Sequence, residues 1–192
     1  MRGVTSVPHS SQRGFSLLEL TIVVGIIAAL FAVALDRFLA LRVQAERVSL
    51  MQMEGTLESA LGIQLAAYIA RGDMADVARM RGMNPMDLLM QPPSNYVGAL
   101  DHPDPASIRG GYWYFDTRTR ILVYRVHSSG YFHDALGKPA RAEYRIQLLY
   151  SGAKKDGRYD PHRDELYGVR LVNLAPYQWS NSPPRSAWFL NW

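Results

Sequence analysis

The sequence contains no cysteine. This absence excludes disulfide bonds, thiolate metal sites and cysteine nucleophiles. It does not assign the protein to a reducing compartment, because a domain with an adequate core needs no disulfide. At 192 residues the chain has room for one domain with a tail or anchor, but hardly for two full cores.

Dense runs of basic residues are also absent. The formal net charge is +4 and the pI is about 9.4, yet the lysines and arginines are scattered along the chain. Nucleic-acid-binding proteins usually carry a concentrated basic patch or tail. We therefore predict no nucleic-acid partner.

The sequence also lacks the common catalytic patterns. It has no phosphate-binding glycine loop, no Gly-x-Ser-x-Gly elbow and no His-Glu-x-x-His pair. His127 is followed by two serines, but no acidic residue is implied that would orient it. We expect no enzyme activity, no cofactor and no metal site. The five histidines lack metal-ligand spacing, and we interpret all of them as surface or loop residues: His9, His102, His127, His133 and His162.

A charged segment at residues 151–164 is the nearest approach to a cation site. The pattern of Asp156, Asp160, Asp164 and Glu165 differs from an EF-hand loop, and four lysines and arginines lie among these residues. We interpret the segment as a solvated charged loop rather than as a calcium site.

Residues 15–35 form the dominant feature, a run of 21 apolar or small residues whose single charge is Glu19. As a helix it would span about 30 Å, the thickness of a bilayer's hydrocarbon core. A buried core helix and a secretory signal peptide cut near Ala34 are the alternatives. The run is too long for a signal peptide, and it continues past Ala34. Residues 1–14 carry Arg2 and Arg13 without an acidic residue, which favours a membrane helix with a cytoplasmic leader.

Glu19 is the anomalous residue of this run. An ionisable side chain inside an apolar span costs a few kcal/mol or more unless it reaches the interface or finds a partner. Two interpretations follow. Either the carboxylate lies at headgroup depth near the helix end, or it pairs with a positive group inside the membrane or an assembly.

A resemblance to a known family is carried by Arg13–Val24, which read Arg-Gly-Phe-Ser-Leu-Leu-Glu-Leu-Thr-Ile-Val-Val. This segment resembles the N-terminal processing motif of type IV pilins and type II secretion pseudopilins. The resemblance implies cleavage by a prepilin peptidase between Gly14 and Phe15, N-methylation of Phe15, and an assembly role for Glu19 as the fifth mature residue. It covers only the first 30 to 35 residues.

The same resemblance supplies a partner for Glu19. Cleavage would create a cationic amine at Phe15, and a buried carboxylate is tolerable when it is paired and hydrogen-bonded. We therefore hypothesise that the Phe15 amine of one subunit neutralises Glu19 of its neighbour.

One departure from the family concerns the proline that many members carry just after the apolar run. Here no proline lies between Pro8 and Pro85.

The pattern after the apolar run predicts that the helix continues. Residues 36–71 carry apolar side chains mostly at three- and four-residue spacing, and Gly72 is expected to end the helix. Short helices are expected through Arg81 and, after the Asn84-Pro85 start signal, over residues 86–90. The methionines of this region are predicted to fill the core: Met74, Met80, Met83, Met86 and Met90.

Strand patterns follow. Residues 111–115 and 120–126 flank Asp116–Thr119 as a hairpin, and residues 142–150 and 165–174 supply two further candidates. We predict an α+β fold in which the long N-terminal helix packs against a C-terminal antiparallel sheet of about four strands, a pilin-like layout. The aromatic tail, residues 177–192, is expected to pack on its own head.

Four segments are thus predicted: leader 1–14, transmembrane or filament-core helix 15–35, amphipathic continuation 36–71 and globular head 72–192. The resemblance implies a structural, non-enzymatic subunit of a type IV pilus or secretion pseudopilus. It would be a single-pass protein of the bacterial inner membrane with a periplasmic head. The implied partners are prepilin peptidase, other pilin or pseudopilin subunits, the membrane and an inner-membrane assembly platform. The alternatives are a signal-anchored exported enzyme or binding domain, and a secreted module cut after Ala34.

Overall fold

The computed structural model describes residues 16–151, 159–160 and 162–180. The chain divides into two units, residues 1–41 and residues 42–192. One helix, α1 (Leu17–Arg71), runs through both, so its second half belongs to the same unit as the head.

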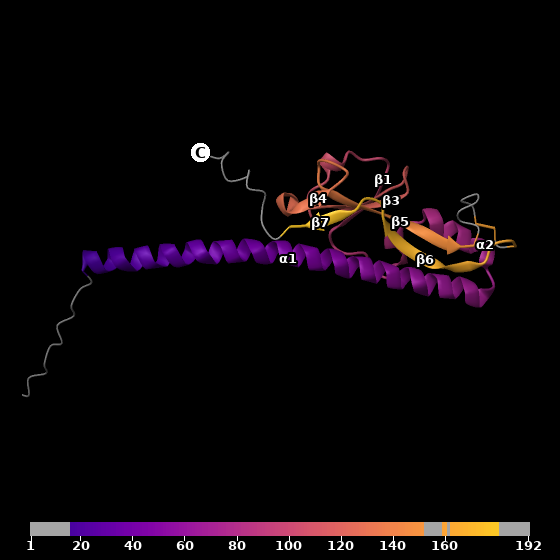
Figure 1. Ribbon diagram of the computed structural model, residues 1–192, viewed down its shortest axis with the longest axis horizontal. Coiled ribbons are helices and arrows are strands. Elements are labelled where there is room, and N and C mark those ends of the chain that lie inside the picture. Colours follow the sequence, from indigo (N-terminus) through magenta and orange to yellow (C-terminus); the bar gives the residue numbers. More distant parts are fainter. Residues whose placement is uncertain (1–15, 152–158, 161, 181–192) are drawn as a thin grey trace, which may run out of the picture. The chain divides into compact units, whose positions relative to one another are not determined.

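Helix α1 is 55 residues long and ends where the sequence predicts (Figure 1). Gly72 follows with φ +74°, a left-handed conformation that glycine adopts without a steric penalty. The N–H of Gly72 donates to the carbonyl of Ile69, and the N–H of Asp73 donates to the carbonyl of Tyr68, both at 3.0 Å. This pair of bonds satisfies carbonyls that the helix end would otherwise leave open.

The head contains a five-stranded sheet and a two-stranded one. The main sheet has the order β1-β2-β3-β5-β6, and the small sheet pairs β4 with β7. The strands are β1 (Tyr96–Leu100), β2 (Trp113–Asp116), β3 (Ile121–Arg125), β4 (Phe132–Asp134), β5 (Arg141–Tyr150), β6 (Leu166–Asn173) and β7 (Tyr177–Trp179). The predicted α+β layout is therefore confirmed, together with the hairpin and both later strands.

The predicted antiparallel sheet of about four strands is observed as a mostly antiparallel sheet of five described strands. Strand β1 pairs with β2 in parallel, and the other pairs of the main sheet are antiparallel. Strand β1 was not predicted, because Gly98 interrupts it and its hydrogen-bonding partner lies in a later segment of the chain. The N–H of Trp113 donates to the carbonyl of Asn95 at 2.8 Å, and the N–H of Thr117 donates to that of Leu100 at 2.9 Å.

The second half of α1 covers one face of the main sheet (Figure 1). Leu50, Leu57 and Leu61 are at most 2% exposed and recur on one side of the helix. They join the inward side chains of the sheet in a single core: Trp113, Phe115, Leu122, Tyr124, Ala142, Tyr144, Ile146, Leu148 and Leu171. Burial of one leucine side chain stabilises the fold by about 1.5–3 kcal/mol.

Short helices connect α1 to the sheet. They are α2 (Met74–Val77) and the 3₁₀ turns η1 (Ala78–Gly82) and η2 (Pro85–Leu88); η3 (Pro105–Ser107) and η4 (Ser129–Tyr131) follow later. As predicted, Asn84 caps η2, since its side-chain oxygen accepts from the N–H of Met86 at 3.1 Å. The predicted end of the helix over residues 86–90 is wrong, because η2 ends at Leu88.

The methionine prediction is right for four residues and wrong for one. Met80 and Met86 are fully buried, and Met74 and Met83 pack against the core. Met90 is fully exposed, since it lies beyond η2 in the loop before Pro92.

The beginning of the aromatic tail packs on the head. In the small sheet, the rings of Tyr177 and Trp179 lie 4.8 and 5.0 Å from the ring of Phe132, measured between centroids. The remainder of the predicted tail, residues 181–192, lies outside the described residues.

Candidate assembly helix and its anchorage in the head

The first turn of α1 carries Glu19, the only predicted site residue that the structure describes. Gly14 and Phe15 lie outside the described residues. The hydroxyl oxygen of Ser16 accepts from the N–H of Leu18 at 3.3 Å, and its carbonyl accepts from the N–H of Leu20 at 3.1 Å. Glu19 is exposed, and a carboxylate in the first turn interacts favourably with the positive end of the helix.

The part of α1 from Leu17 to Leu41 exposes apolar side chains around the helix. The most apolar 18-residue window has a mean hydropathy of 2.6, and none of it is buried. A helix that is apolar on all sides is stable only inside a membrane or when other protein segments surround it. The exposed large apolar side chains are Leu17, Leu18, Leu20, Ile22, Val23, Val24, Ile26, Ile27, Leu30, Phe31, Val33, Leu35, Phe38 and Leu41.

Residues 9–35 match the family described as the prokaryotic N-terminal methylation motif. The chain carries the N-terminal signature of type IV pilins and pseudopilins. No curated protein and no solved structure matches this chain significantly. The signature and the long apolar helix are consistent with a single-pass, membrane-anchored pilin-like protein.

In this pilin-like chain, two glutamates fix the second half of α1 on the sheet. Glu46 Oε1 accepts from the hydroxyl of Tyr124 at 3.0 Å and from the N–H of His127 at 2.6 Å. Its Oε2 accepts from the N–H of Ser128 at 2.8 Å. One carboxylate on the helix thereby satisfies three donors at the end of β3.

Glu54 makes the second attachment, eight residues further along α1. Its Oε1 accepts from the hydroxyl of Tyr144 on β5 and, at 2.8 Å, from that of Tyr177 on β7. The two hydroxyls lie 3.3 Å apart. Glu54 therefore joins the helix, the main sheet and the small sheet.

The phenols of these attachments are held in their neutral form. Burial and the carboxylate of Glu46 raise the pKa of Tyr124, and burial and Glu54 raise the pKa of Tyr144. Burial raises the pKa of Tyr177 to about 12, to which Glu54 contributes. Each phenol is thus a stable hydrogen-bond donor to its glutamate.

The sequence pattern predicted a helix over residues 36–71 but did not identify Glu46 and Glu54 as contacts to the sheet. The signal lay in their spacing, because Glu46, Leu50, Glu54, Leu57 and Leu61 follow one another at three or four residues. Residues at this spacing lie on one face of a helix, so the two glutamates face the same neighbours as the three leucines.

The other candidate groups, the histidines and the acidic residues near residue 160, form no metal-binding cluster in the part of the chain that the structure describes. No group of three or more histidines and acidic side chains is placed there to hold a metal. Asp156 lies outside the described residues. The side chains of Asp160 and Asp164 accept from the N–H groups of His162 and Asp160, at 3.0 and 2.9 Å.

The histidine positions follow the prediction wherever they are described. His102, His127, His133 and His162 are exposed, and His9 lies outside the described residues. His102 Nδ1 lies 3.2 Å from the carboxylate of Asp116, the last residue of β2.

Proposed function

We propose that this chain is a structural subunit, of the minor class, in a type IV pilus or a type II secretion pseudopilus. The observation that carries the proposal is the methylation motif at residues 9–35, joined to an unburied apolar helix that continues into an α+β head. The absence of cysteine favours the minor class, because it leaves no disulfide-bearing loop of the kind many major pilins carry.

In this proposal the subunit is made as a prepilin. Prepilin peptidase cuts between Gly14 and Phe15, and the new amine is then N-methylated. Residues 15–35 hold the subunit in the bacterial inner membrane with its head in the periplasm, until the assembly platform transfers the helix into a filament. The chain performs no catalysis itself; its role is to polymerise.

Glu19 provides the electrostatic step of assembly. In a filament core its carboxylate would leave water, and an unpaired buried charge is strongly unfavourable. The methylated amine at Phe15 of a neighbouring subunit stays cationic and neutralises it. Formation of this pair also selects one axial register between adjacent helices.

The experiment that tests this role replaces the native copy of the chain by Glu19→Val and measures its amount in the sheared filament fraction relative to the membrane fraction. We expect the variant to be cleaved and membrane-bound, but incorporated at least about tenfold less, as loss of one buried ion pair implies. Glu58→Val is the matched control, because Glu58 is an exposed glutamate on the same helix. Equal incorporation of Glu19→Val and the native chain would refute the proposed pairing.

A further inference from the structure

The head contains a groove of about 860 Å³, bordered by residues of β3, η4, β4 and the loop before β5. Its lining combines two cationic side chains, Arg125 and Lys138, with the carboxylate of Asp134, the imidazoles of His127 and His133, and apolar surface. All of these residues belong to the unit formed by residues 42–192. The groove lies outside the apolar helix on which the proposed assembly depends.

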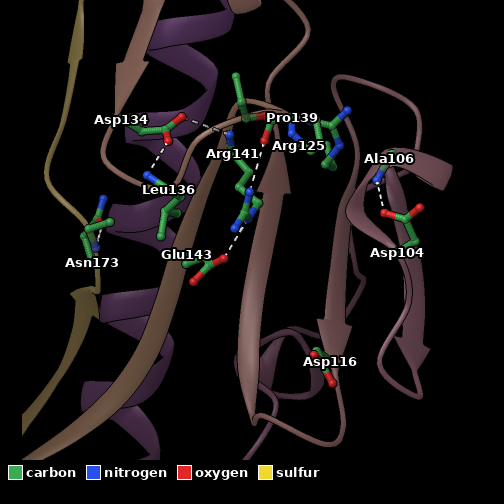
Figure 2. A network of polar contacts seen from close by, with 12 residues as sticks. Asp104, Ala106, Asp116, Arg125, Asp134, Leu136, Pro139, Arg141, Glu143 and Asn173 are labelled. Atoms are coloured by element: carbon green, nitrogen blue, oxygen red, sulfur yellow. Dashed lines mark hydrogen bonds and ion pairs between the residues drawn. The ribbon is translucent and has the colours of Figure 1, made fainter.

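Arg125 is the unusual residue of this groove. Its side chain is only 9% exposed, yet no carboxylate of the described residues forms an ion pair with it. Two of its nitrogens are used by backbone carbonyls: Nη1 donates to Ala140 at 2.7 Å and Nε donates to Ile108 at 3.3 Å. A buried guanidinium ordinarily has an anionic partner, because its charge is costly to remove from water. Figure 2 shows Arg125 between Pro139 and the loop that carries Asp104 and Ala106.

The nearby carboxylates are already engaged with other groups (Figure 2). Asp134 accepts from the N–H groups of Leu136 and Arg141, at 2.7 and 3.4 Å. The guanidinium of Arg141 pairs with Glu143 at 2.8 Å.

Asp104, on the neighbouring loop, accepts from the N–H of Ala106 at 2.8 Å. Burial lowers the pKa of Arg125 and the neighbouring cation Arg141 adds to this effect, whereas Tyr114 and the carboxylate of Asp104 oppose it. Even so, a guanidinium keeps its charge throughout the physiological range. The groove is therefore left with a net positive character.

We propose that this groove binds an extended acidic peptide segment of a partner protein, with a Glu or Asp side chain of that segment paired to Arg125. Guanidinium and carboxylate match in shape and form the strongest class of side-chain hydrogen bonds. Lys138, which is exposed at the rim, supplies a second cation for a neighbouring acidic residue.

The size of the groove favours a peptide over a free small anion. A carboxylate group occupies a space comparable to two or three water molecules of about 30 Å³ each, a small part of the groove. Val126, Phe132 and Pro139 line the remaining space and suit the aliphatic parts of an extended chain. Volumes of about 300–1,000 Å³ are typical of sites that enclose larger ligands.

The test measures binding of fluorescein-labelled hexaglutamate to the full-length chain in nonionic detergent, by fluorescence anisotropy. We expect saturable binding that weakens as the salt concentration rises, and none with labelled hexaglutamine. Arg125→Gln should weaken binding at least about tenfold, since it removes the charged anchor. Lys138→Gln at the exposed rim should weaken binding by about threefold.

Arg170→Gln is the control, because Arg170 is exposed on β6 and does not line the groove. It should leave the affinity unchanged. If Arg125→Gln fails to fold, the exposed pair Lys138→Gln and His133→Gln carries the test, with a combined loss of several-fold expected.

Four results would overturn the proposal. Hexaglutamine could bind as tightly as hexaglutamate, or Arg170→Gln could weaken binding as much as Lys138→Gln. Alternatively, succinate could displace the peptide at equal concentration, which would make this a site for small dicarboxylates. Absence of saturable binding up to millimolar peptide would also contradict it.

Discussion

Glu46 is the residue whose contacts show most clearly how α1 and the sheet hold together. Its carboxylate accepts from one phenol and two backbone N–H groups. A single substitution therefore leaves three donors without their acceptor, and each buried donor left without a partner costs about 1–3 kcal/mol unless water replaces it.

Glu46→Ala should lower the free energy of unfolding by about 2–4 kcal/mol, because part of this loss is recovered by water at the exposed N–H of His127. The measurement is urea unfolding of the full-length chain in nonionic detergent, followed by tryptophan fluorescence. Glu58→Ala removes an exposed carboxylate from the same helix and should change the free energy by less than about 0.5 kcal/mol. Similar losses for the two variants would show that the contacts of Glu46 add nothing to stability.

Tyr177 makes the stability of the head sensitive to alkaline pH. Its pKa is raised to about 12 in the folded head by burial and by Glu54, whereas in the unfolded chain a tyrosine ionises near pH 10. The unfolded chain therefore loses this proton first. The contribution of Tyr177 is fully present below about pH 10 and is lost as the pH rises toward 12.

Tyr177→Phe should therefore flatten the decline of unfolding free energy between pH 10 and 12, by at most about 1.4 kcal/mol per pH unit. The comparison uses slopes, because the lost hydrogen bond also lowers the free energy at neutral pH. Tyr167→Phe, at a residue that is 65% exposed, should leave the slope unchanged. Parallel pH curves for Tyr177→Phe and the native chain would contradict this account.

Sequence alone located Glu19 but not the partners of Glu46. The N-terminal motif is contiguous, so Gly14, Phe15 and Glu19 can be assigned by position without any knowledge of the fold, and these assignments stay predictions. Tyr124 is 78 positions from Glu46, and only the packed head brings the two together. The sequence could reveal that Glu46 faces the core, but not which donors it would meet.

At the scale of elements, close packing between the loop before β2 and the end of β3 depends on Gly110. A Cβ atom there would lie 2.9 Å from the Cα of His127 and 2.9 Å from the carbonyl oxygen of Val126. Both are backbone atoms, which cannot rotate away as a side chain can. The loop and β3 would have to separate.

Gly110→Ala should therefore destabilise the head by about 1–3 kcal/mol through this steric conflict. Gly130→Ala is the matched control, since a Cβ at Gly130 meets no atom within 4 Å and its backbone is not left-handed. That variant should be within about 0.5 kcal/mol of the native chain. Thermal unfolding followed by circular dichroism distinguishes the two, and equal stability of both variants would refute the contact.

The elements whose contacts join residues close together in the sequence were predicted well. The β2–β3 hairpin is closed locally: Asp116 accepts from the N–H groups of Arg118 and Thr119, at 2.9 and 3.2 Å. Strand β1 and the β4–β7 pair depend on remote partners, since His133 faces Gln178 across the small sheet. Short strands of this kind carry too few residues for a periodic signal.

On the scale of the whole molecule, an α+β layout followed from the order of the patterns along the chain. A long segment that is first apolar and then amphipathic precedes the strands. The structure places the second half of this segment on the main sheet. The groove was not predictable, because Arg125, Lys138 and His133 converge only through the arrangement of β3, β4 and the loop before β5.

The central claim is that the chain is processed as a prepilin. The measurement that tests it most directly is the intact mass and N-terminal sequence of the protein purified from its native membrane. The account predicts a chain that begins at N-methylated Phe15 and contains the 178 residues that follow Gly14. A chain that begins at Met1 or at Leu35 would contradict it, and the head would then belong to an anchored or secreted protein of another class.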